Sequence, residues 1–166
     1  TIVPPNEVMD VQEIRLETWC METLLPELVN TDVVLQWCAR RKLIANHKTC
    51  QLCHQQCSLG RYGQGIDGRR WACDACGSRK PVRDGSFFAK SHLTIKQIIL
   101  MVYCWSHDMP QKIIQHETNI SRRFIIDWCN FLREECEGLL EGNAGEIGGF
   151  DINGEPIVVE IDESKY

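Results

Sequence analysis

The amino-acid sequence predicts an α+β fold, with helical segments on both sides of a cysteine- and glycine-rich middle that contains short strands. Apolar residues recur at helical spacing before residue 47 and after residue 93. Between those positions the pattern changes to two C-x2-C pairs, several glycines and short strand-like runs at residues 69–73 and 78–83. With 166 residues, 43% hydrophobic and 25% charged, the chain has a globular composition. No apolar run approaches the ~20 residues that span a bilayer, so no membrane partner is expected.

Residues 1–46 are expected to form an N-terminal helical region. Apolar positions at helical spacing over residues 8–29 predict one amphipathic helix, with Pro26 as the expected site of any break. Thr31 can cap a second helix, whose apolar positions continue to about Asn46. The basic run RRK near its end is favourable to the helix dipole.

Four of the ten cysteines form two C-x2-C pairs with nineteen residues between them. A structural Zn²⁺ takes four tetrahedral ligands, and each C-x2-C turn places two thiolates on one side of the ion. The glycine-rich segment between the pairs can return the chain to the metal. The spacing therefore predicts a zinc ribbon with a basic strand over residues 47–92 and a closed, structural Zn²⁺ site. The predicted ligands are Cys50, Cys53, Cys73 and Cys76.

The other cysteines leave alternatives open. His54 or Cys57 could replace one of the four ligands, but Cys57 has no C-x2-C partner and is expected to be a free or packed thiol. Two disulfides or four unrelated thiols are the alternative to zinc, and a redox site using one pair is another. Five cysteines lie in apolar, helix-like segments and are expected in the core: Cys20, Cys38, Cys104, Cys129 and Cys136.

The charge distribution is uneven. The formal net charge is −5, yet residues 31–96 contain twelve basic and four acidic side chains, and residues 131–166 contain two basic and ten acidic ones. A basic middle between acidic ends indicates a surface for a polyanion, with a solvated charged face as the alternative. The candidates for phosphate contacts are Arg69, Arg70, Arg79, Lys80, Arg83 and Lys90.

Residues 93–141 contain three helical segments separated by short turns: TIKQIILMVYCWSH, PQKIIQHET and SRRFIIDWCNFLREECEGLL. Their lengths and turns predict a helix-turn-helix DNA-binding domain, with a three-helix bundle as the alternative. In the last helix Ser121 is the expected cap. The expected inward face is Phe124, Ile125, Trp128, Cys129 and Leu132. The outward side chains expected to contact DNA bases are Arg122, Arg123 and Asn130.

Taken in order, these pieces resemble the N-terminal part of ISXO2-like transposases, the group that includes bacterial IS1016-type elements and eukaryotic Merlin transposons. The resemblance covers residues 31–166. Its motifs are RRKLI before the first C-x2-C, RRWAC at the second, SRKPVRDGSFFAKSHLTIKQIILMVYCW, ISRRFIIDW and IVVEIDESKY.

The resemblance implies a cut-and-paste DNA transposase with an RNase H-like catalytic domain of the DDE type. Residues 142–166 would be a linker and the first, truncated part of that domain, with Asp162 matching the first catalytic Asp of the family's IDES motif. Such enzymes hold two Mg²⁺ ions between carboxylates. The other carboxylates are expected beyond residue 166, so the chain is expected to bind DNA without cutting it.

The implied partners are the double-stranded DNA of transposon ends and a second copy of the chain in a homodimer. The implied location is intracellular, in the nucleus of a eukaryote or in the cytoplasm or nucleoid of a bacterium. Without the motif match, Asp162 would be interpreted as a solubilising acid at the end of an edge strand. The alternative function is a domesticated transcription regulator or adaptor that uses the same ribbon and helices without transposase activity.

Overall fold

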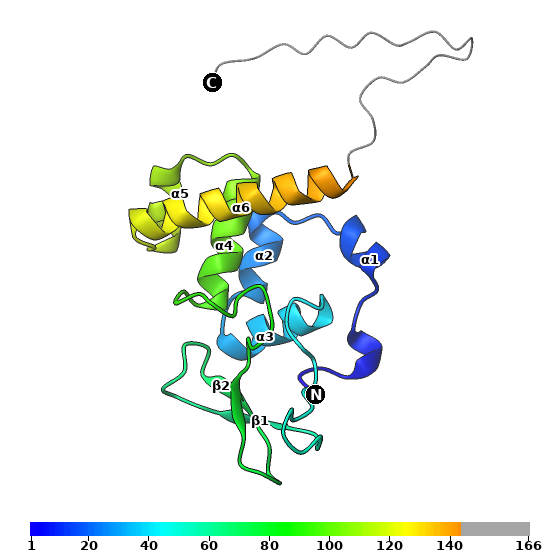
Figure 1. Ribbon diagram of the computed structural model, residues 1–166. Coiled ribbons are helices and arrows are strands. Elements are labelled where there is room, and N and C mark those ends of the chain that lie inside the picture. Colours follow the sequence, from blue (N-terminus) through cyan, green and yellow to red (C-terminus); the bar gives the residue numbers. More distant parts are fainter. Residues whose placement is uncertain (144–166) are drawn as a thin grey trace, which may run out of the picture. The chain divides into compact units, whose positions relative to one another are not determined.

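The computed structural model describes residues 1–143, and within them the chain divides into two compact units at the Pro110–Gln111 boundary (Figure 1). The described residues form six α-helices, a short 3₁₀ helix and one three-stranded antiparallel sheet, so the predicted α+β class is confirmed. The first unit contains, in chain order, η1 (Pro5–Glu7), α1 (Val11–Leu16), α2 (Met21–Glu27), α3 (Thr31–Arg40), β1 (Ser58–Arg61), β2 (Arg69–Ala72), β3 (Arg79–Pro81) and α4 (Ile95–Ser106). The second contains α5 (Gln111–Thr118) and α6 (Arg122–Asn143).

The N-terminal region departs from the single helix predicted over residues 8–29. A capping box between Asp10 and Glu13 starts α1, and the chain is extended at Glu17, where α1 has ended. The break occurs here because Glu17 forms an ion pair with Arg41 at 2.6 Å and the Trp19 ring packs edge-on against Trp37, 5.6 Å between centroids. Contacts with α3 thus override the local helical period. Pro26, the predicted site of a break, lies inside α2.

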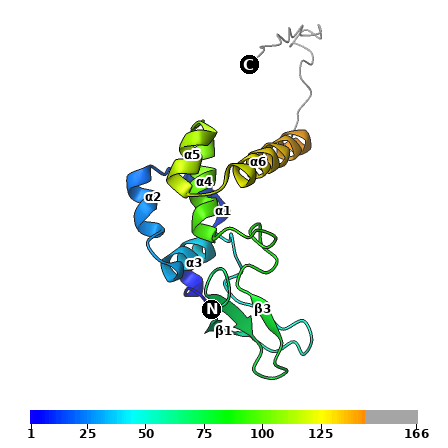
Figure 2. The ribbon, with the colours of Figure 1, turned by 90° about the vertical axis from the view of Figure 1, so that its left-hand side faces the viewer.

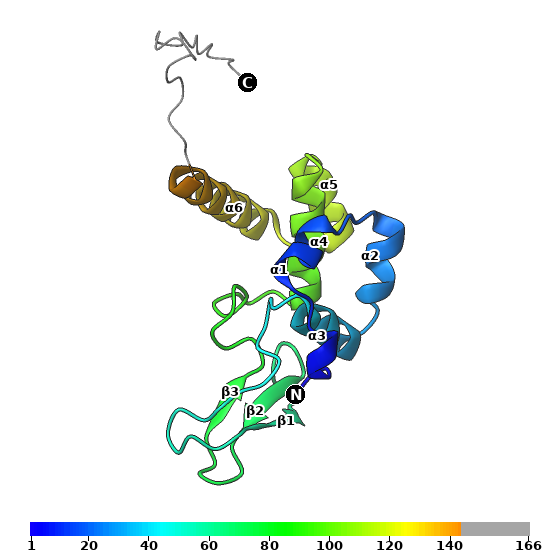
Figure 3. The same cartoon turned by 90° about the vertical axis from the view of Figure 1, so that its right-hand side faces the viewer.

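Helix α3 is shorter than predicted. Its cap is Asn30, whose Oδ1 accepts the Val33 N–H at 3.1 Å, and Thr31 is the first helical residue. The helix ends at Arg40, before the predicted Asn46, and Lys42 adopts a left-handed backbone with φ 59°. The buried face of α3 consists of Val34, Leu35, Trp37, Cys38 and Ala39. Helix α3 contacts both α2 and α4, and the strands lie on the side of α3 away from α4 (Figures 1 and 3).

The sheet has the order β1-β2-β3, with both pairs antiparallel (Figure 3). Trp71 at the centre of β2 faces Leu59 of β1 and Lys80 of β3, and it is only 1% exposed. The edge strand β3 is exposed at all three of its residues. The strands predicted around residues 69–73 and 78–83 are therefore present as β2 and β3, whereas β1 was not predicted.

Helix α4 begins with a capping box in which Thr94 Oγ1 accepts the Gln97 N–H and Gln97 Oε1 accepts the Thr94 N–H. Helix α4 contacts α3 (Figure 2), and its buried residues are Ile95, Ile98, Ile99, Leu100, Met101 and Cys104. The division at residue 110 separates α4 from α5 and α6, which the sequence-based domains had grouped together. Across residues 1–143, no helix combines the length and apolar character needed to cross a membrane.

In the second unit, α5 and α6 contact one another across a three-residue turn in which Asn119 is left-handed, with φ 52°. Both helices and the turn lie where the sequence predicts them. Of the expected inward face of α6, Ile125, Cys129 and Leu132 are buried, but Phe124 is 42% exposed and was wrongly placed there. Whether the two helices belong to a helix-turn-helix remains a prediction.

Candidate metal centre and basic cleft

Each C-x2-C pair forms a tight turn with the same backbone bonding. The carbonyl of Cys50 accepts the His54 N–H at 3.0 Å, and the carbonyl of Cys73 accepts the Gly77 N–H at 2.8 Å. In both turns the residue that donates this N–H is left-handed, with φ 58° at His54 and 74° at Gly77. The two turns are therefore local copies of one knuckle, although only the second has the glycine that this backbone favours.

The two knuckles bring the four predicted ligands together. Their sulfur atoms all lie within 4.8 Å of one another. The closest pairs join opposite knuckles, with Cys50 and Cys76 at 3.4 Å and Cys53 and Cys73 at 3.3 Å. Tetrahedral zinc at ~2.3 Å from each sulfur requires sulfur–sulfur separations of about 3.8 Å. The donor set fits this geometry, and the four cysteines could hold a metal ion such as zinc.

Backbone N–H groups favour the thiolate form in each knuckle. The N–H groups of Cys53 and Leu52 hydrogen-bond to the sulfur of Cys50 and lower its pKa to about 6. In the second knuckle, the N–H of Cys76 and then the Cys53 thiol lower the pKa of Cys73. Thiolates are the metal-binding form of cysteine, and N–H donors directed at sulfur are the usual support of a metal knuckle.

The remaining thiol of the first knuckle shows the opposite shift. The Gln55 N–H favours the thiolate of Cys53, but hydrogen bonding with the Cys73 thiol and burial outweigh it and raise the pKa of Cys53 to about 12. Four negative sulfurs cannot share so small a volume without a compensating cation. A positive ion at the centre would provide that compensation, so the cluster could hold a metal ion.

The other cysteines divide between core and surface. All ten are free thiols, and Cys38, Cys104 and Cys129 are buried as predicted. Cys20 and Cys136 are exposed, so their placement in the core was wrong. Cys57 is half-buried, and its pKa is raised by burial and by the nearby charges of Cys73 and Cys50. Among the described residues, the cluster of ligand atoms contains neither Cys57 nor His54.

All six predicted phosphate-contacting residues line one cleft of about 490 Å³ in the first unit. It is lined by the β1–β2 loop, by residues of β2 and β3, and by the segment after β3. The sequence had grouped these six only by charge, and their meeting in one cleft is a result of the ribbon's folding. They are not equivalent, however, because their surroundings differ.

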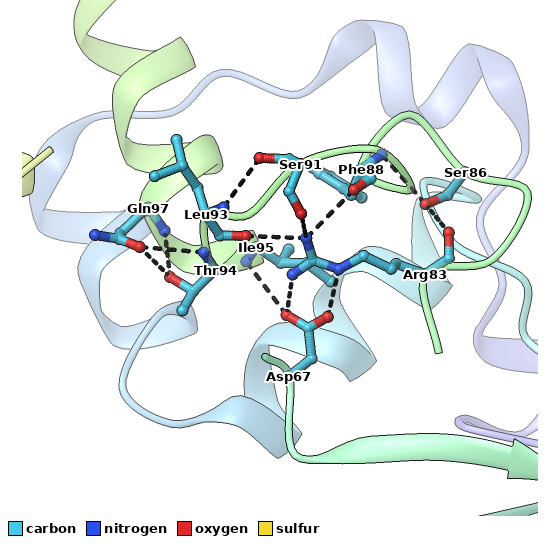
Figure 4. A network of polar contacts seen from close by, with 9 residues as sticks. All are labelled: Asp67, Arg83, Ser86, Phe88, Ser91, Leu93, Thr94, Ile95 and Gln97. Carbon is cyan, nitrogen blue, oxygen red and sulfur yellow. Dashed lines mark hydrogen bonds and ion pairs between the residues drawn. The ribbon is translucent and has the colours of Figure 1, made fainter. Parts of the chain in front are cut away.

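Arg83 is a structural residue and not a phosphate contact. Only 4% exposed, it forms a two-bonded ion pair with Asp67, with both N···O distances at 2.5 Å. Its Nη1 also donates to the carbonyls of Phe88, Ser91 and Leu93 at 3.3, 3.0 and 2.9 Å (Figure 4). The prediction for Arg83 was wrong because the guanidinium is buried and its donors are already used.

Arg69 is also compensated. Its Nε and Nη2 donate to the two carboxylate oxygens of Asp32 at 2.8 and 2.7 Å, and its side chain is 20% exposed. This hydrogen bonding lowers the pKa of Asp32. The pair presents little net charge to the cleft, so Arg69 is a weaker candidate for phosphate binding than its position in the basic run suggested.

The other four cations have no carboxylate partner among the described residues. Arg70 lies over the Tyr62 ring, 4.4 Å from its centroid, which fixes its direction without neutralising it. Arg79 and Lys80 stand on the exposed edge strand, and Lys90 is exposed on the segment after β3. These four residues, Arg70, Arg79, Lys80 and Lys90, are hereafter the cleft cations.

In the second unit, the predicted base-contacting residues Arg122, Arg123 and Asn130 are all exposed. The Oδ1 of Asn130 accepts a hydrogen bond from Arg133 at 3.1 Å. The charge order of α6 opposes the helix dipole, since its first turn is basic and its second half contains Glu134, Glu135 and Glu137. Such an arrangement disfavours the isolated helix and suits an external anion at its N-terminus.

Sequence reasoning missed the acids and rings that organise the cleft. Tyr62 and His92 line it, and Asp67 pairs inside it. Asp67 lies between two glycines in GIDG, a pattern typical of an exposed turn, so no local signal indicated burial. The predicted catalytic Asp162 and its strand lie outside the described residues.

Comparison with protein-family models, curated proteins and solved structures gave no match for this chain. The proposed DNA binding therefore rests on the geometry of the described residues, and the proposed transposase role rests on the motif resemblance.

Proposed function

We propose that this chain binds double-stranded DNA as the N-terminal region of a cut-and-paste transposase and recognises the terminal inverted repeats of its transposon. The observation that supports DNA binding most directly is the gathering of the four cleft cations on a scaffold fixed by the cysteine cluster. Cations on a rigid scaffold lose little conformational freedom when they bind phosphates, and they release counterions from the duplex.

Zinc is the ion proposed for the cluster. Four thiolates within tetrahedral reach are the donor set of closed structural zinc sites, which leave no coordination position for a substrate. Its role would be to hold the two knuckles and thereby the edge strand β3. Metal analysis should find about one tightly held zinc per chain, as a single four-cysteine site requires.

Helix α6 would supply sequence preference in this proposal. Arg122 and Arg123 in its first turn can reach guanine edges or phosphates, and Asn130 can pair with adenine if the bond from Arg133 opens. The positive charges of Arg122 and Arg123 are unfavourable at the N-terminus of the free helix, and a bound phosphate would compensate them.

The enzymatic part of the proposal concerns Asp162, as the first carboxylate of a Mg²⁺-dependent DDE centre in an RNase H-like domain. Two further carboxylates are needed before two metal ions can be held. A homodimer belongs to the same proposal, because joining two transposon ends requires both ends to be bound together.

The test begins with selection of bound duplexes from a random DNA pool. The expected result is an enriched sequence that recurs as inverted repeats beside the coding region. Affinity is then measured over a salt series for Arg79→Ala/Lys80→Ala and for Arg122→Ala/Arg123→Ala. The first variant should weaken binding to every duplex and flatten the salt dependence, whereas the second should reduce the preference for the selected sequence.

The matched control is Arg15→Ala/Lys96→Ala, which removes the same charge from exposed positions that do not line the cleft. It should leave affinity nearly unchanged. Equal losses in the control and in Arg79→Ala/Lys80→Ala would show that net charge alone attracts DNA, and the cleft would be the wrong surface.

A further inference from the structure

Two segments without regular secondary structure line the basic cleft and are called its two walls here. One is the β1–β2 loop, residues 62–68, which contributes Tyr62 and Asp67. The other is the segment from residue 84 to 93, here the wall loop, which contributes Lys90 and His92. The sheet connects the two walls indirectly, because the β1–β2 loop leads into β2, which pairs with β3 ahead of the wall loop. A direct contact between the two loops would fix their separation more closely.

The buried pair of Asp67 and Arg83 connects the two walls. Asp67 belongs to the β1–β2 loop, and Arg83 lies directly before the wall loop. From there the Arg83 guanidinium donates to three carbonyls, those of Phe88 and Ser91 inside the wall loop and Leu93 at its end (Figure 4). The wall loop is thus folded around a guanidinium that Asp67 of the β1–β2 loop neutralises.

The same carboxylate also reaches α4. Asp67 Oδ1 accepts the Ile95 N–H at 3.4 Å, at the first residue of the helix. A negative charge at a helix N-terminus is favourable. One buried acid therefore ties together the β1–β2 loop, the wall loop and the start of α4, all within the first unit (Figure 4).

We propose that Asp67 and Arg83 are a positioning pair that sets the separation of the cleft walls, so that Lys90 contacts the same DNA backbone as Arg70, Arg79 and Lys80. Neither member of the pair touches DNA. The inference rests on the proposed DNA binding and adds that affinity depends on a buried acid.

Asp67→Asn separates this role from simple electrostatics, because the two predict opposite signs. The substitution keeps the size of the side chain and removes one negative charge from the cleft. If charge alone mattered, DNA would bind more tightly. A positioning role predicts about tenfold weaker binding. The plot of log K against log salt should also become less steep by about 0.9, which corresponds to the loss of one phosphate contact.

A double-mutant cycle with Lys90→Ala gives a second measurement, the coupling between the two substitutions in DNA affinity. A general loosening of the fold would not produce this coupling. Lys90→Ala should weaken binding in the wild-type chain and have almost no further effect beside Asp67→Asn. The control is Asp32→Asn, which also removes an acid paired with an arginine but lies outside the cleft lining. It should bind DNA as tightly as wild type or more tightly.

Zinc content and helicity are checked for every variant. If Asp67→Asn fails to fold, Arg83→Lys keeps the charge and removes most of the donors, and the same cycle is run with it. Hydrogen exchange of the wild-type chain needs no variant: DNA should protect residues 62–66 and 89–92 together. Tighter binding by a folded Asp67→Asn with an intact Lys90 effect, or protection of one wall alone, would overturn the inference. Absence of DNA binding by the wild-type chain would instead overturn the proposed function.

Discussion

Gly77→Ala is the sharpest test of the knuckle geometry. Gly77 has φ 74°, and a Cβ added there would meet no atom within 4 Å. The substitution therefore introduces backbone strain without a steric clash. The left-handed conformation costs a residue with a Cβ about 1–2 kcal/mol. Loss of chain freedom in the unfolded state returns about 0.4–1 kcal/mol, so the net loss of stability should be about 1 kcal/mol.

The assay is thermal unfolding at fixed zinc concentration, combined with a chelator titration. A loss of about 1 kcal/mol lowers Tm by about 4–8 °C in a domain of about 100 residues. Because metal binding and folding are coupled, zinc should also be removed at a lower chelator concentration. The reverse change, His54→Gly in the first knuckle, relieves similar strain and adds unfolded-state freedom, so the same two terms give a net gain in stability of about 1 kcal/mol.

The matched control is Gly60→Ala in β1, where an added Cβ likewise meets nothing within 4 Å and no left-handed φ is required. It should be neutral or slightly stabilising. If Gly77→Ala and Gly60→Ala unfold at the same temperature, the left-handed knuckle is not present in solution and the proposed equivalence of the two knuckles is wrong.

Three further predictions follow from the same contacts. Chelating the metal should expose the four cluster thiols to a thiol reagent and remove the β-sheet signal in circular dichroism, and unchanged sheet content would contradict a structural role. The pKa of Asp32 is lower in the folded state than in the unfolded state, so its pair with Arg69 stabilises the folded protein at any pH above the unfolded pKa. This stabilisation is lost as pH falls through the folded pKa. Asp32→Asn should therefore remove this part of the acid sensitivity of unfolding, and the amplitude should be small because the pair is partly solvated. Gly65→Ala places a Cβ 2.8 Å from Tyr62 Cδ1 and should push the ring from under Arg70, giving weaker DNA binding with unchanged zinc content; a variant that binds like wild type would show that the ring does not orient the cation.

Elements whose signals are local could be predicted from the sequence. The cysteine cluster follows from spacing within each knuckle, and α4 follows from its apolar period and its Thr94 cap. The interruption between α1 and α2 could not be predicted, because it depends on Trp19 packing against Trp37 and on Glu17 pairing with Arg41. Those partners are remote in the sequence, and the helical period of residues 8–29 gives no indication of them.

In the candidate site, the basic residues could be found in the sequence, but which of them pair with an acid could not. The basic run offered six cations, and by charge alone each would displace counterions, giving a slope of log K against log salt of about −5.4. The structure compensates two of them, Arg83 through Asp67 and Arg69 through Asp32. The four cleft cations alone correspond to a slope of about −3.6. A metal knuckle needs only its own neighbours, but the availability of a cation depends on acids that the fold brings to it.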